Sequence, residues 1–219
     1  MPKELVLQCT PSRLTWNIIT NYSQVCKGQW NIIRTEEHFQ NIATALPNLI
    51  EWHGAYARPK SKSYLCMASI FPKLPSHITH LNLTMENEFR RENMCPPFFQ
   101  KVALQVHFCK EMARAMPALE HFGYTGRVCG SFFDTMAALS NPRTSRLKSV
   151  ELTVKNLCRP PLQWNDGSAI TDMAFIYSFE TLVHSAVRSL RRLPALDYVN
   201  IKFIDLGIFP SYLFSLFIN

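Results

Sequence analysis

Four side chains that could bind a metal ion or move a proton lie beside short apolar segments of the chain: Glu51, His53, His80 and His121. Imidazole and carboxylate groups are zinc ligands, and histidine also titrates near neutral pH. No tight ligand spacing of the kind found in zinc motifs supports a metal site here. We therefore interpret these histidines as solvated groups on the face of a sheet, and we expect no metal ion and no cofactor.

Sequence signatures of catalysis are also weak. The segment Gly123-x-x-Gly126-x-x-x-Gly130 lacks the Lys-Ser/Thr pair that grips phosphates and does not match G-x-G-x-x-G, so we interpret it as a flexible loop after a strand. The chain contains no G-x-S-x-G, no H-E-x-x-H and no C-x-x-C pair. Its cysteines are therefore expected to be reduced, with Cys66 and Cys109 buried, and the chain is not expected to be an enzyme.

A short phrase, L-x-x-Φ-x-Φ, in which Φ is apolar or aromatic, recurs along the chain and would position these side chains. Its units are Leu49/Trp52/Gly54, which is imperfect, Ile78/Leu81/Leu83, Leu119/Phe122/Tyr124, Leu147/Val150/Leu152 and Leu196/Val199/Ile201. Three units follow an apolar residue and a proline: Leu46-Pro47, Met116-Pro117 and Leu193-Pro194. The spacing leaves room for one strand and one helix per unit, which is typical of stacked-repeat proteins.

Helical periodicity fills the gaps between these units. It predicts helix starts at Thr35, at Ser61 or Ser63, at Pro96-Pro97, at Ser131 and at Asp172, with the helix from Pro96 running to Met116. A doubly wound sheet would carry continuous apolar strands because both its faces are covered, whereas these strands alternate apolar and polar residues. We therefore predict an α/β fold, an irregular leucine-rich-repeat-like solenoid with parallel strands and helices on one face.

The repeats divide the chain into three parts. Residues 35–207 should form the leucine-rich-repeat-like domain, and residues 1–34 an N-terminal cap or partial repeat. Residues 208–219 form an apolar C-terminal tail without charge. Either this tail packs over the edge of the last strand, or it is an apolar end exposed by truncation. We favour truncation, because a cap of a repeat array should be polar on its outer side.

Side chains alternate along a strand, so residues beside the buried anchors should point to an open face. They form three rows across the units: Glu51, His80, His121, Ser149 and Tyr198; His53, Asn82, Gly123, Glu151 and Asn200; Ala55, Thr84, Thr125, Thr153 and Lys202. Only Ala55 and Gly123 lack a polar group. The candidate protein-binding face comprises Glu51, His53, His80, Asn82, His121, Glu151, Tyr198, Asn200 and Lys202.

These rows favour a non-enzymatic protein-interaction scaffold. The alternative is a small α/β enzyme with a pocket near the strand C-termini, in the segment from Gly123 to Gly130, where open parallel sheets bind their ligands. The net charge of +7 is spread along the chain without an aromatic stacking motif, so nucleic acid is not an expected partner. No apolar run has membrane-spanning length and the N-terminus Met-Pro-Lys-Glu is polar, so we expect a cytoplasmic or nuclear protein with a protein partner.

Three segments carry a resemblance to a known family: Ala45-Leu-Pro-Asn-Leu-Ile-Glu-Trp-His53, Ala55-Tyr-Ala-Arg-Pro-Lys60 and Leu74-Pro-Ser-His-Ile-Thr-His-Leu-Asn-Leu83. They resemble the repeat region of F-box/leucine-rich-repeat-like proteins of filamentous fungi, over roughly residues 30–207. The resemblance implies the substrate-recognition part of a ubiquitin-ligase adaptor, with ligase subunits or their substrate as partners. The chain has no Leu-Pro-x-Glu-(Leu/Ile) F-box opening followed by a three-helix pattern, so the resemblance concerns the repeats alone.

Overall fold

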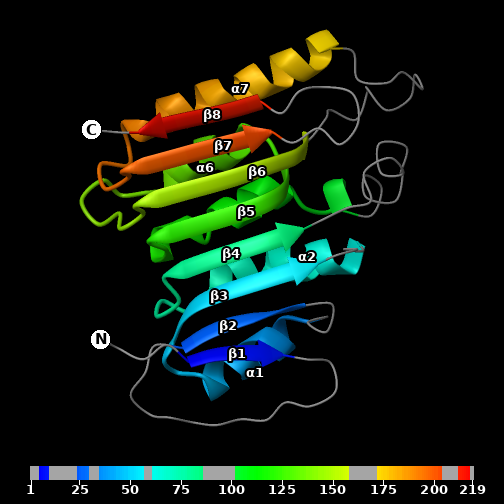
Figure 1. Ribbon diagram of the computed structural model, residues 1–219, viewed down its shortest axis with the longest axis vertical. Helices are drawn as coiled ribbons and strands as arrows, with labels where there is room; N and C mark the ends of the chain where they lie inside the picture. The colour runs from blue at the N-terminus through cyan, green and yellow to red at the C-terminus, as the bar shows by residue number, and fades with distance from the viewer. Residues whose placement is uncertain are drawn as a thin grey trace.

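Helices and strands alternate along the chain, and the strands form one eight-stranded sheet in chain order (Figure 1). The computed structural model describes residues 5–9, 24–29, 35–56, 61–85, 102–157, 172–203 and 212–217. The strands are Leu5–Cys9 (β1), Gln24–Gln29 (β2), Leu49–Tyr56 (β3), His80–Met85 (β4), His121–Val128 (β5), Ser149–Leu157 (β6), Tyr198–Phe203 (β7) and Tyr212–Phe217 (β8). Neighbouring strands from β1 to β7 are parallel, and β8 is antiparallel to β7.

The described helices lie behind the sheet in Figure 1, so the strand face toward the viewer is open. They are Glu36–Ala45 (α1), Ser61–Ile70 (α2), Phe108–Ala113 (α5), Ser131–Leu139 (α6) and Asp172–Leu190 (α7), with the 3-10 turns Phe71–Lys73 (η2) and Met116–Ala118 (η4). In β4, buried and partly exposed residues alternate along the whole strand. This alternation agrees with the predicted α/β class and with a sheet that is covered on one face.

The predicted anchors form the core between the sheet and the helices. Leu81, Leu83, Val150, Leu152, Val199 and Ile201 are all at most 2% exposed, which confirms the predicted strand register. In the first unit, in which Gly54 stands at the last anchor position, Phe39 of α1 stacks on the anchor Trp52 with ring centroids 4.0 Å apart. Burial of side chains of this size stabilises the fold by about 1.5–3 kcal/mol each.

The start of each strand unit carries the same backbone hydrogen bond. The residue after the first apolar position of one unit donates its N–H to the carbonyl of the matching residue in the unit before: Thr79 to Ile50, Glu120 to Thr79, Lys148 to Glu120 and Asp197 to Lys148, at 2.7–2.9 Å. We call this series the junction ladder. Its members lie directly before β4 to β7 and at the second residue of β3, and the same backbone bond recurs with different residue types, so successive units are joined in the same way.

The Leu-Pro and Met-Pro pairs form the turns that lead into this ladder. Leu49, Leu119 and Leu196 donate their N–H groups to Leu46, Met116 and Leu193, three residues earlier, at 3.0–3.1 Å. Each acceptor residue is buried, and each is followed by the proline. Proline is favoured at this second position of a turn because its ring fixes φ.

Most predicted helix starts are confirmed. Thr35 caps α1, with its hydroxyl accepting a hydrogen bond from the His38 N–H at 3.3 Å, and α2, α6 and α7 begin at Ser61, Ser131 and Asp172. The single helix from Pro96 to Met116 is wrong. Residues 96–101 lie outside the described residues, and beyond them the chain leaves helical geometry at His107, whose ψ is 88°.

A helical interruption before α5 has a packing reason. Val102 and Phe108 are 0% and 5% exposed, whereas Leu104 between them is 68% exposed. The break at residues 104–107 therefore lets the chain insert both Val102 and Phe108 into the core, which a continuous straight helix would place on different faces.

The sheet extends beyond the five predicted units at both ends. Leu5–Cys9 and Gln24–Gln29 are strands within residues 1–34, for which the sequence predicts only an N-terminal cap or partial repeat. At the other end, β8 falls within the apolar tail and pairs with β7 from Tyr212↔Phe203 to Phe217↔Tyr198. The tail therefore covers the edge of the last predicted strand, which is the alternative that the sequence interpretation did not favour. The side chains of β1, β2 and β8 lie outside the described residues.

Candidate functional site

The open face of the sheet carries the predicted polar rows in the predicted register. Glu51, His80, His121, Ser149 and Tyr198 are direct neighbours on successive strands β3 to β7. The second row joins His53, Asn82, Gly123, Glu151 and Asn200, and the third joins Ala55, Thr84, Thr125, Thr153 and Lys202. The parallel sheet thus brings all nine residues of the candidate protein-binding face together.

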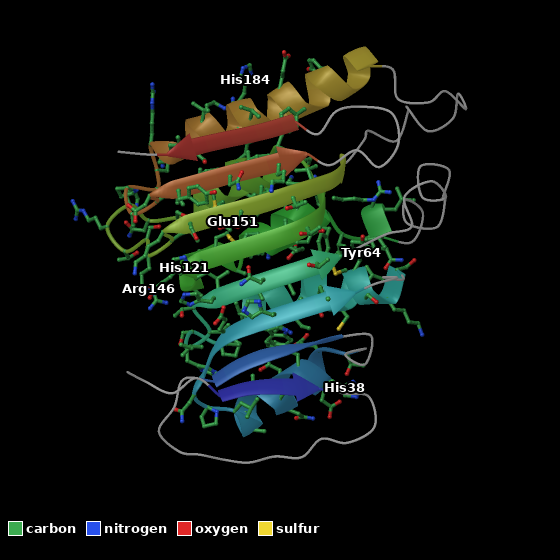
Figure 2. All side chains as sticks on the ribbon, in the orientation of Figure 1. His38, Tyr64, His121, Arg146, Glu151 and His184 are labelled. Atoms are coloured by element: carbon green, nitrogen blue, oxygen red, sulfur yellow. The ribbon has the colours of Figure 1, made fainter. Side chains whose placement is uncertain are left out.

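None of the fifteen residues in these rows is buried, in contrast to the anchors between them. Glu151, Lys202 and Ala55 are exposed, and the remaining twelve are partly exposed. Figure 2 shows Glu151 and His121 over the face of the sheet that is turned away from the helices. The threonines of the third row are cross-strand neighbours on β4, β5 and β6, an arrangement in which each pair contributes about 0.2–1 kcal/mol.

The four candidate metal or proton ligands on this face form two side-chain pairs. His53 Nε2 lies 2.5 Å from Glu51 Oε1, and both side chains remain about 30% exposed. The rings of His80 and His121 stack with centroids 4.4 Å apart. The Nδ1 atom of each ring is hydrogen-bonded to a hydroxyl group: Thr79 Oγ1 lies 2.8 Å from His80 Nδ1, and Ser149 Oγ lies 2.8 Å from His121 Nδ1. In the described part of the chain, these four residues do not form a metal-ligand group.

The surroundings of His80 disfavour its charged form. Burial is the main cause, and the neighbouring His121 adds to it, so the pKa of His80 lies below its usual value of 6.5 although Glu51 and Glu120 oppose the shift. A neutral imidazole beside a second imidazole presents an aromatic, hydrogen-bonding surface at neutral pH. The first row is therefore suited to polar and stacking contacts.

The glycine-rich segment is not a loop, so that interpretation is wrong. Gly123 and Gly126 lie within β5, and Gly130 is the residue before α6. A Cβ at Gly123 would lie 2.0 Å from Asn82 Oδ1, so this glycine leaves room for the Asn82 side chain on the open face. Gly126 has φ 157°, and a Cβ there would lie 2.5 Å from the Tyr124 hydroxyl. These glycines serve strand geometry and close packing.

One group of candidate ligands was missed. His107, Cys109 and Cys129 place their ligating atoms within 4.8 Å of one another, and no other metal-ligand group of three or more occurs among the residues that the structure describes. His107 precedes α5, Cys109 is its second residue, and Cys129 follows β5. A hydrogen bond with Cys129 raises the pKa of His107 in spite of partial burial. The only sequence signal was His-x-Cys, which is too short to be specific.

The buried-thiol prediction is confirmed for Cys66 and Cys109, which are 6% and 1% exposed. Burial raises the pKa of the Cys66 thiol, with a further contribution from Glu36. Cys66 lies in α2, outside the group of three.

Comparison with protein-family models, with curated proteins and with solved structures finds no match to this chain. No helix in the described ranges combines the length and the apolar character needed to cross a membrane.

Proposed function

We propose that the chain is a non-enzymatic scaffold that binds a protein partner on the open face of β3 to β7. The observation that carries the proposal is a set of thirteen polar residues, all exposed or partly exposed, that lie in register with Ala55 and Gly123 across five parallel strands. Such a face offers hydrogen-bond donors and acceptors at fixed spacing, about 4.8 Å between strands. A partner can therefore be recognised without a cleft.

We further propose that the chain is an irregular leucine-rich-repeat-like solenoid. Strand order follows chain order, whereas a doubly wound sheet reverses its order at a switch point. The junction ladder and the repeated turns give each unit the same backbone connection to the unit before it. Stacked repeats of this kind typically present extended binding surfaces.

The ubiquitin-ligase adaptor is the more specific form of the proposal, and it is supported by the resemblance of the repeat phrases. In that role the open face would bind the substrate of the ligase, and ligase subunits would co-purify with the chain. A scaffold of another pathway would bind through the same face but would not recover them.

The experiment compares capture of partners by the wild-type chain and by a variant with His80, Asn82, Glu151 and Asn200 all replaced by Ala. A matched control replaces four exposed residues of the helical layer: Glu37, Lys62, Lys110 and Glu180. We expect the face variant to lose the captured protein while it still unfolds cooperatively, because Glu151 is exposed and His80, Asn82 and Asn200 are partly exposed, so that none of the four substitutions opens the buried core. The control should retain the partner.

Mass spectrometry of the captured material then tests the partner class. Ligase subunits captured by both forms of the chain, together with a substrate that is lost only from the face variant, would support the adaptor. Equal capture by the wild-type chain and the face variant would refute binding on the open face. Recovery of nucleic acid in place of protein would refute the protein-binding scaffold.

A further inference from the structure

Three ligand-type side chains converge at the carboxyl end of β5, away from the rows of the open face: His107, Cys109 and Cys129. Each pair of their ligating atoms lies within 4.8 Å. Tetrahedral zinc, with Zn–S near 2.3 Å and Zn–N near 2.0–2.1 Å, would separate such atoms by about 3.5–3.8 Å. Side-chain adjustments on the order of 1 Å would therefore bring the three groups to coordination distance.

The backbone at all three positions is already fixed. The His107 carbonyl accepts hydrogen bonds from the N–H groups of Lys110 and Glu111 at 2.8 and 3.1 Å at the start of α5. The Cys129 carbonyl accepts a hydrogen bond from the Phe132 N–H at 3.0 Å as α6 begins. All three residues thus lie at or close before the start of a helix, where the backbone is already hydrogen-bonded, so the backbone would need little further ordering when a ligand binds.

Solvent access differs among the three groups. Cys109 is buried, and its Sγ lies 3.9 Å from the Arg127 carbonyl oxygen, to which it donates. Cys129 is partly exposed and His107 is exposed. An ion could therefore enter from the side of His107 and reach the buried sulfur.

We propose that His107, Cys109 and Cys129 bind one Zn²⁺ ion, with a solvent molecule as the fourth ligand. Thiolate and imidazole ligands favour zinc over the hard cations Mg²⁺ and Ca²⁺. On binding, each cysteine releases its thiol proton to solvent, so that two thiolates balance the charge of the ion. This site is independent of the proposed function on the open face.

A disulfide between Cys109 and Cys129 would explain the proximity of the two sulfur atoms but not that of the His107 imidazole. It would use the two sulfurs and leave the imidazole, which is hydrogen-bonded to Cys129, without a role. Zinc uses all three groups.

The test uses the full chain, kept reduced and stripped of metal, and titrates it with Co²⁺ as a spectroscopic substitute for Zn²⁺. We expect one Co²⁺ per chain, with the intense visible bands of tetrahedral cobalt and thiolate-to-cobalt charge-transfer absorption, both abolished by added Zn²⁺. The variants His107→Ala and Cys129→Ala should weaken binding by more than the roughly 10–100-fold that follows loss of a group that only supports a ligand.

Two control variants separate this site from other histidines and thiols. His184→Ala removes an exposed histidine, which Figure 2 places on α7, and Cys66→Ala removes a thiol outside the group. Both should bind Co²⁺ like the wild-type chain. Absence of tetrahedral cobalt absorption in the reduced wild-type chain, or equal binding by wild-type, His107→Ala and Cys129→Ala, would overturn the proposal. Because His107 is exposed, its replacement tests the site without opening the core.

Discussion

Leu152→Ala tests whether the alternation along the strands holds the fold together. Leu152 is 0% exposed on β6, and its cross-strand neighbours Tyr124 and Ile201 are 2% and 0% exposed. The substitution removes about three methylene equivalents at roughly 0.8 kcal/mol each, or about 2.4 kcal/mol of transfer free energy. Because buried neighbours on both sides limit collapse of the space, the cavity should raise the loss to about 3–5 kcal/mol.

The matched control is Glu151→Ala, one residue away on the opposite face. Glu151 is exposed, so its replacement should change the free energy of unfolding by about 0.5 kcal/mol or less. Urea denaturation of both variants and the wild-type chain measures this difference, and thermal melting should show a drop of roughly 6–20 °C for Leu152→Ala alone. If the two variants unfold alike, or if Glu151→Ala is the more harmful, the register of β6 is wrong and so is the assignment of the open face.

Three further variants test His80 of the open face and the two glycines of β5. The pKa of His80 is lowered in the folded chain, so the unfolded chain takes up a proton at this histidine first as the pH falls through about 6.5. His80 should therefore lower the free energy of unfolding on acidification and have no such effect above that pH. In urea titrations between neutral and acidic pH, the His80→Gln variant should lose less stability than the wild-type chain. An equal or steeper loss in His80→Gln would contradict this. Gly126→Ala should destabilise by about 1–3 kcal/mol, because φ 157° is unfavourable for alanine and the Met85 carbonyl oxygen lies 3.1 Å from the added Cβ. Gly123→Ala should cost less, since only the movable Asn82 side chain is in the way, and calorimetric melting that ranks the two in reverse would refute the explanation.

The strand rows could be predicted from the sequence because the period of a strand is two. Once Leu81/Leu83 and Val150/Leu152 were assigned to the core, His80, Asn82 and Glu151 had only the other face to occupy. Parallel pairing of equivalent units then placed the rows side by side, as the structure has them. Local pattern and tertiary arrangement coincide in this part of the chain.

The missed elements depend on contacts between distant segments. Gln24–Gln29 has few apolar residues, and its strand geometry comes from pairing with β1 and β3. The break at His107 reflects competition between helix continuity and burial of Val102 and Phe108, which periodicity alone cannot weigh. Cys129 meets His107 and Cys109 only because β5 returns the chain to the start of α5, so their proximity has no local signature.

The junction ladder bears on how freely this sequence can vary. Its members are Ile50, Thr79, Glu120, Lys148 and Asp197, which share no side-chain chemistry, because only their main-chain groups take part. The ladder itself excludes only proline, at the four donors, because proline has no N–H. The side chains add separate contacts, such as the ion pair between Lys148 Nζ and Glu120 Oε2 at 2.7 Å. A comparison by residue identity therefore gains little from the backbone bonds that join the units. Relatives of this architecture are better sought by the spacing of turns and buried anchors, with these joining positions left unconstrained.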